Sequence, residues 1–132
     1  MNDRKATREA LAALVATNTT LVEVYDNETL DFGGRSPVAM VQSDGTAAGP
    51  ALTLSGHMRQ QRYILSLWWR RGETTEDDMD ELSAAIYDLL EANSGLTPDW
   101  GSLEAADGFS ELDYPILDGV MYRRERIRVV AW

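Results

Sequence analysis

The stretch RYILSLWWRR, residues 62–71, predicts the central β-strand of the fold. Because side chains alternate across a strand, one face carries Tyr63, Leu65, Leu67 and Trp69, and the other carries Ile64, Ser66 and Trp68, with Arg70 at its end. Both faces therefore hold apolar area that must be covered. Helices can cover the first face. The second face is either a covered core face or a contact surface formed by Trp68 and Arg70, since tryptophan is common in both settings.

The stretch VMYRRERIRVVAW, residues 120–132, predicts a second long strand. One of its faces carries Ile127, Val129 and Ala131, and the other carries Arg124, Arg126 and Arg128. In a chain of net charge −10, three arginines in a row call for carboxylate or phosphate partners. They form either a contact surface for a partner or an exposed face that is balanced by the chain's own acids. Nucleic acid is a weaker partner, because the surface around the row should be acidic.

Two amphipathic helices are predicted on either side of the strand-rich middle. Ala10, Leu11, Leu14 and Val15 form one stripe at helical spacing within residues 7–15, and Met79, Leu82, Ile86, Leu89 and Leu90 form another after Gly72. Each stripe is apolar on one side only. We therefore expect both helices to pack on the sheet, the second one against the face that carries Leu65 and Leu67.

The remaining segments complete the predicted order. Residues 19–25 and the VAMVQ stretch after Pro37 are strand candidates, residues 43–50 read as a flexible loop, and residues 96–119 read as an acidic, irregular stretch. The expected fold class is α+β, a mainly antiparallel sheet with two helices packed on one face, in the order α-β-β-β-α-β. Residues 1–132 are expected to form a single domain.

Composition excludes several classes of function. The chain has 22 acidic and 12 basic residues, so binding to DNA or to anionic membranes is disfavoured over most of its surface. It has no cysteine, which removes disulfides, thiolate nucleophiles and cysteine-based zinc sites. No apolar run approaches the roughly twenty residues of a membrane span, and we expect synthesis in the cytoplasm with no membrane partner.

No residue pattern predicts catalysis, a cofactor or a metal. The acidic run at 76–81 lies in the first turns of a helix, where the macrodipole favours carboxylates, and His57 is a lone histidine without a nucleophile motif. A small hydrolase remains a weaker alternative. It would use one of two acid pairs, Asp107 with Glu111 or Asp113 with Asp118.

The overall layout resembles a known family. The chain combines a short N-terminal helix, the strand segment HMRQQRYILSLWWRR (57–71), the helix segment TTEDDMDELSAAIYDLLEA (74–92) and the closing strand GVMYRRERIRVVAW (119–132). This layout, spread over most of the chain, resembles the small tail-terminator and neck proteins of long-tailed bacteriophages, which join head and tail.

The resemblance implies a structural protein of the virion that is assembled in the host cytoplasm. Its subunits would form a hexameric ring that caps the tail tube, binds the head connector protein and lets DNA pass through its lumen without specific binding. A flexible loop at 43–50 and an interface of Trp68, Arg70, Arg124, Arg126 and Arg128 would serve the subunit contacts. The alternative is an acidic protein-binding module such as a DNA-mimicking inhibitor, supported by the charge of −10.

Overall fold

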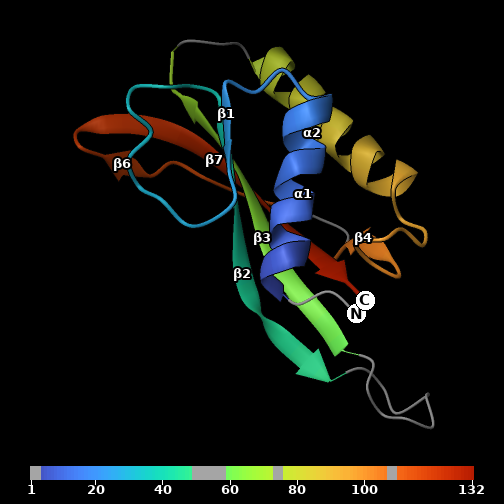
Figure 1. The fold of residues 1–132 in the computed structure, drawn as a ribbon. Helices are drawn as coiled ribbons and strands as arrows, with labels where there is room; N and C mark the ends of the chain where they lie inside the picture. The colour runs from blue at the N-terminus through green and yellow to red at the C-terminus, as the bar shows by residue number, and fades with distance from the viewer. Residues whose placement is uncertain (1–3, 49–58, 73–75, 107–109) are drawn as a thin grey trace, which may run out of the picture.

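The computed structural model describes residues 4–48, 59–72, 76–106 and 110–132. The elements follow one another as α1 (Arg4–Asn18), β1 (Glu23–Tyr25), β2 (Val38–Ala48), β3 (Arg59–Arg70), α2 (Glu76–Ala92), β4 (Leu103–Ala105), β5 (Glu111–Asp113), β6 (Ile116–Leu117) and β7 (Val120–Ala131). Two helices and a mostly antiparallel sheet make this an α+β fold, as the sequence predicts (Figure 1).

Three long strands form the centre of the sheet. β2 pairs antiparallel with β3, and β3 pairs antiparallel with β7, with Leu65 opposite both Val41 and Ile127. β1 continues the sheet beyond β2, and the outer edge of β7 pairs in turn with β4, β5 and β6. The predicted central strand and the predicted arginine-bearing strand are therefore neighbours.

One face of the sheet lies under both helices. The core there contains Tyr63, Leu65, Leu67 and Trp69 from β3 together with Ile127, Val129 and Ala131 from β7, all at most 2 % exposed. Leu11 and Val15 of α1 pack on it, as do Met79, Ile86 and Leu90 of α2, while Leu82 and Leu89 are partly buried at its margin. The predicted packing of the second helix on this face is confirmed.

The other face has a smaller core of its own. β1 runs parallel to β2, so the chain between them, residues 26–37, has to return along the sheet before β2 can start. We call this segment the crossover loop. It brings Phe32 to within 5.1 Å of Trp68 and 5.6 Å of Tyr122, measured between ring centroids. These three side chains are all buried, with Val38 and Met40 beside them.

Three predictions about local structure are corrected. Of the predicted loop at 43–50, residues 43–48 are the end of β2, and residues 49 and 50 lie outside the described residues. The strand passes a bulge between Ser43 and Gly45, where Gly45 has a φ of +106° that glycine adopts readily. Residues 96–119 are not wholly irregular but contain β4, β5 and β6. β1 covers only the last three residues of the predicted 19–25 strand, and it is parallel to its neighbour.

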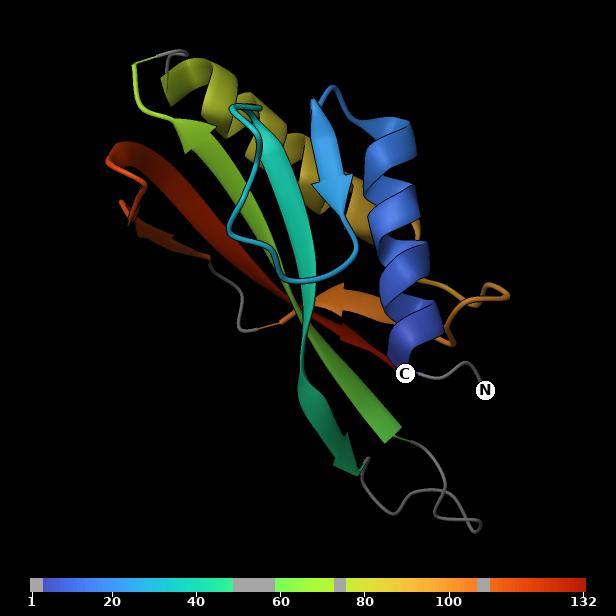
Figure 2. The ribbon, with the colours of Figure 1, turned by 60° about the vertical axis from the view of Figure 1, so that its left-hand side comes forward.

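Strands β2 and β3 continue together past the helices. Their pairing runs on to Ala48 and Arg59, two residues of β3 past Gln61, where β7 ends, and the pairing of β1 with β2 ends at Met40. Figure 2 shows this two-stranded ribbon extending beyond the end of α1. A second projection, the β6–β7 hairpin, leaves the other end of the sheet (Figure 1).

Candidate interaction surfaces

The arginine row of β7 pairs with carboxylates of the same chain. The register places Glu111 opposite Arg126 and Asp113 opposite Arg124, so the acids of β5 lie on the same face of the sheet as the row. Arg124 holds Asp113 with two hydrogen bonds, of which the Nε–Oδ1 bond measures 2.8 Å. Glu111 lies 3.1 Å from Arg126 Nη2 and 3.2 Å from Arg128 Nη2. Of the two interpretations left open by the sequence, the structure supports a strand face balanced by the chain's own acids.

The pKa of Asp113 reflects this pairing. The hydrogen bonds from Arg124 lower the pKa of the Asp113 carboxyl below its usual value, against a smaller opposing effect of burial. The same contact raises the pKa of the Arg124 guanidinium. A carboxyl group with a lowered pKa is a poor proton donor at neutral pH. The pairing therefore argues against Asp113 as the proton donor of a hydrolase. Glu111 forms ion pairs with two arginines, Arg126 and Arg128.

Trp68 and Arg70 face the crossover loop. Trp68 is 3 % exposed, and the Arg124 guanidinium lies 5.0 Å from the centroid of its ring. Arg70 donates from Nη2 to the carbonyl oxygen of Gly34 at 2.8 Å, and its backbone N–H donates to Ser36 Oγ. For Trp68, the structure supports the covered core face instead of the contact surface. Both residues hold the crossover loop on the sheet.

Two charged residues of β7 are buried, which was not predicted from the sequence. Arg123 and Glu125 are 6 % and 5 % exposed and lie on the same face as Ile127, under α2. Glu125 accepts hydrogen bonds from Ser83 at 2.8 Å and Ser110 at 2.6 Å, and Arg123 pairs with Asp80 at 3.2 Å. The alternation of side chains that predicts the arginine row also places Arg123 and Glu125 on the face under the helices. Their position could therefore have been predicted from the sequence. They tie α2 to β7.

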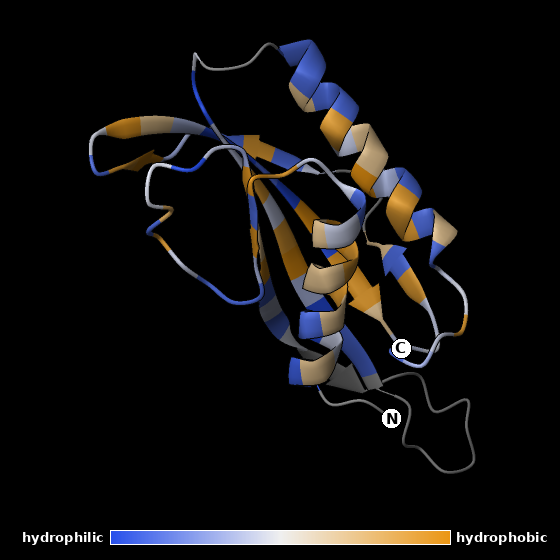
Figure 3. Ribbon diagram, turned by 45° about the horizontal axis from the view of Figure 1, so that its top comes forward, coloured by the Kyte–Doolittle hydropathy of each residue, from blue (hydrophilic) through white to orange (hydrophobic). Residues whose placement is uncertain are grey.

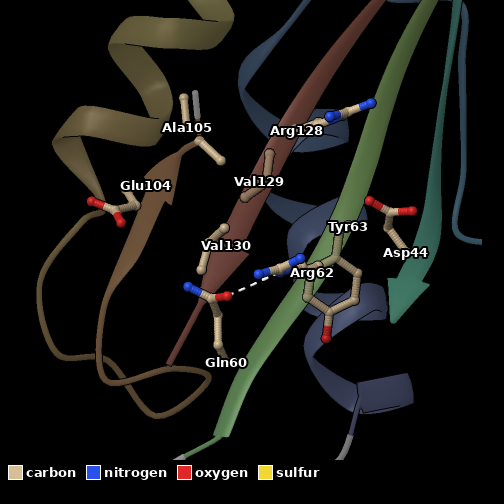
Figure 4. A pocket seen from close by; sticks show the side chains of 10 residues that line it. Asp44, Gln60, Arg62, Tyr63, Glu104, Ala105, Arg128, Val129 and Val130 are labelled. Carbon is tan, nitrogen blue, oxygen red and sulfur yellow. Dashed lines mark hydrogen bonds between the residues drawn. The ribbon is translucent and has the colours of Figure 1, made fainter. Parts of the chain in front are cut away.

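A polar hollow of about 520 Å³ lies beside the arginine row (Figure 4). Its charged lining residues are Asp44, Arg62, Glu104 and Arg128, and Arg62 donates to Gln60 at 2.9 Å. The two guanidinium groups share the hollow with two carboxylates, so it has no strong excess of either charge. Such balanced lining does not favour a small anion or a cation.

Among the described residues, the candidates for catalysis do not form a common site. His57 and Asp107 lie outside the described residues. Asp118 has a φ of +50° and forms, with Gly119, the turn between β6 and β7. Within residues 4–48, 59–72, 76–106 and 110–132, no three metal-binding side chains are grouped as a metal ion would require.

Neither a family model nor a curated protein matches the sequence. Neither α1 nor α2, the helices of the described residues, is long and apolar enough to cross a bilayer. Fold, charge and exposed apolar surface are therefore the observations from which the function has to be inferred.

Proposed function

We propose that this chain is a structural subunit of a long-tailed bacteriophage, a tail terminator that forms a hexameric ring. The ring caps the tail tube, joins it to the head connector and encloses a lumen through which DNA passes without specific binding. Its location is the virion, at the junction of head and tail. The layout of helices and strands supports this proposal by its resemblance to tail-terminator and neck proteins.

The observation that carries the proposal is the projecting β2–β3 ribbon. Two strands that leave the core of a domain are marginally stable by themselves and gain from a neighbouring surface. β2 has no partner strand on its outer edge beyond Met40 among the described residues, and such an edge is a template for pairing with another chain. In a ring or on a tail tube, a neighbouring subunit supplies that surface.

The test is addition of the purified protein to polymerising tail tube protein. A terminator stops growth, so the tubes should be shorter and more uniform in length, with protein density at one end in negative-stain micrographs. The matched control is an equal amount of a small acidic protein without this fold. Tubes that grow as in the control, with bare ends, would contradict the proposal.

A second candidate, an acidic protein-binding module such as a DNA-mimicking inhibitor, is favoured by one observation. α2 contains no basic residue, and all of its carboxylates are exposed: Glu76, Asp77, Asp78, Asp80, Glu81, Asp88 and Glu91. A row of carboxylates can imitate the phosphates of DNA toward a basic protein. Displacement of labelled duplex from a DNA-binding protein, with no effect on tail tubes, would favour this candidate.

A further inference from the structure

The projecting β6–β7 hairpin carries exposed apolar side chains around one arginine. Tyr114, Ile116 and Met121 are 49 %, 61 % and 41 % exposed. Ile116 and Met121 are direct partners across the two strands, so they lie on one side of the hairpin. The Arg71 guanidinium lies 4.9 Å from the centroid of the Tyr114 ring, and its Nη1 lies 3.2 Å from Met121 Sδ. We call these four residues the hairpin patch.

The patch is larger than a scatter of single surface residues. Lone exposed hydrophobic side chains are ordinary, whereas a contiguous apolar group marks an interaction site. Figure 3 shows hydrophobic colouring on the projecting hairpin, away from both helices. Ile116 and Met121 keep 61 % and 41 % of their surface exposed among the described residues, so a second molecule can pack on them.

A hollow of matching character lies between the two helices. Its volume is about 460 Å³, and its lining includes Pro37, Trp69, Leu82 and Ala85, with Asp78 and Glu81 on α2 beside them. We call it the helix hollow. The patch presents apolar side chains and a guanidinium, and the hollow presents apolar side chains and two carboxylates. The two surfaces are therefore complementary both in polarity and in charge.

One copy of the chain cannot bring the patch and the hollow together. The patch lies on the flank of α2 that faces β7, where Asp80 pairs with Arg123 and Tyr114 lies near Met79. The hollow lies on the opposite flank, where α2 faces the end of α1 at Asn18. Each copy thus carries one donor surface and one acceptor surface on different sides. Repeated contacts of this type run head to tail and close into a ring when the rotation allows.

We propose that the hairpin patch of one subunit inserts into the helix hollow of a second copy of this chain, with Arg71 paired to Glu81 of that copy. The inference rests on the proposed ring and names its lateral contact. It differs from a contact through the arginine row, which already has partners within its own chain.

The absence of cysteine from the chain allows a clean cross-linking test. In the variant that carries both Ile116→Cys and Ala85→Cys, mild oxidation should join neighbours through the patch and the hollow. Denaturing gels should then show a ladder of linked subunits that ends at the subunit number of the ring. Each single variant should give dimers at most. The matched control, Ile116→Cys with Ala16→Cys on the exposed side of α1, should give no ladder.

A charge exchange tests the same contact without new cysteines. Arg71→Glu alone and Glu81→Arg alone should each lower the fraction of assembled rings about tenfold, and the two changes together should restore it. Native mass spectrometry gives that fraction, and circular dichroism confirms that each variant is folded.

The outcomes separate this inference from the proposed function. Rings in the parent, with no ladder from the cysteine pair and no effect of either charge reversal, would overturn the patch-and-hollow contact and leave the ring. A ladder in the Ala16→Cys control equal to that of the pair would overturn it as well. A parent that stays a single chain, even with tail tubes present, would overturn both.

Discussion

Asp113 and Arg124 show how a charged row is fixed within one chain. The carboxyl group accepts two hydrogen bonds from a single guanidinium, which itself lies on the ring of Trp68. Such a two-pronged pair is more rigid than an exposed contact between flexible side chains. It holds β5 on the edge of β7 at the position where the register demands it.

Asp113→Asn should therefore change how stability depends on pH. The pKa of Asp113 is lower in the folded chain than in the unfolded one, where it is about 3.9. Its contribution is thus present above about pH 4 and is lost as the pH falls through the folded pKa. The variant should be less stable at pH 7 by up to about 1 kcal/mol, because the side chain is partly exposed.

Urea unfolding at pH 7 and at pH 3 measures this difference. The difference in free energy of unfolding between the parent and Asp113→Asn should be smaller at pH 3 than at pH 7. The exposed Glu28→Gln control should have nearly the same free energy of unfolding as the parent at either pH. A difference in free energy of unfolding that is larger at pH 3 than at pH 7 would show that Asp113 does not stabilise the fold as a carboxylate.

Ser83 should matter more than a serine usually does. Its hydroxyl donates to the buried carboxylate of Glu125 at 2.8 Å, beneath α2. Loss of a hydrogen bond to a buried charged group costs about 1.5–3 kcal/mol, so Ser83→Ala should lower the free energy of unfolding by that amount. Exposed Ser94→Ala is the control, and equal unfolding midpoints for the two variants would contradict the assignment.

At the scale of elements, α2 is the helix whose packing can be tested most simply. Ile86 lies in its middle, fully buried against the sheet core. Ile86→Ala leaves a cavity and should cost about 2–5 kcal/mol of stability, measured by thermal or urea unfolding. Leu96→Ala, at an 86 % exposed position, should change stability by less than about 0.5 kcal/mol. Equal stability of the two variants would mean that α2 does not pack as described.

The elements that the sequence predicts are the ones with enough length to show a period. β3, β7 and α2 each carry several alternating or helically spaced apolar residues, and their faces are as expected. β4, β5 and β6 have two or three residues each and pair along the edge of β7. Such short strands have no readable period, and tertiary pairing decides them.

Two features of the sequence could have predicted more of the structure. Asp118-Gly119 is a strong hairpin turn pair, and both residues have positive φ in the structure, +50° and +78°. That pair predicts β6 and the projecting hairpin. Phe32, in the segment before Pro37, could have suggested a cover for Trp68. The parallel pairing of β1 had no comparable signal, since neighbouring strands are more often antiparallel.

The candidate site was predicted less well than the fold. The sequence places Arg124, Arg126 and Arg128 on one face correctly, but the positions of Glu111 and Asp113 opposite them depend on the pairing of β5. Without the register of β5 on β7, the sequence does not show that the three arginines have carboxylate partners in their own chain. The hairpin patch likewise depends on tertiary structure, because Arg71 lies far from Tyr114 in the sequence and next to it in space.

At the scale of the whole molecule, the sheet carries projections at two ends. The β2–β3 ribbon leaves one end of the sheet and the β6–β7 hairpin leaves the other (Figures 1 and 2). Both present surface that the chain itself does not cover within the described residues. A subunit of this shape suits repeated contacts in one direction, which is how identical chains build a ring.

Native mass spectrometry of the purified full chain tests the ring most directly. We predict a dominant species at six times the 14.7 kDa of one chain as the protein concentration rises. The fraction of this six-chain species should fall in Arg71→Glu and be restored when Glu81→Arg is added. A spectrum that shows only the single-chain mass at every concentration, with or without tail tubes, would contradict the hexameric ring.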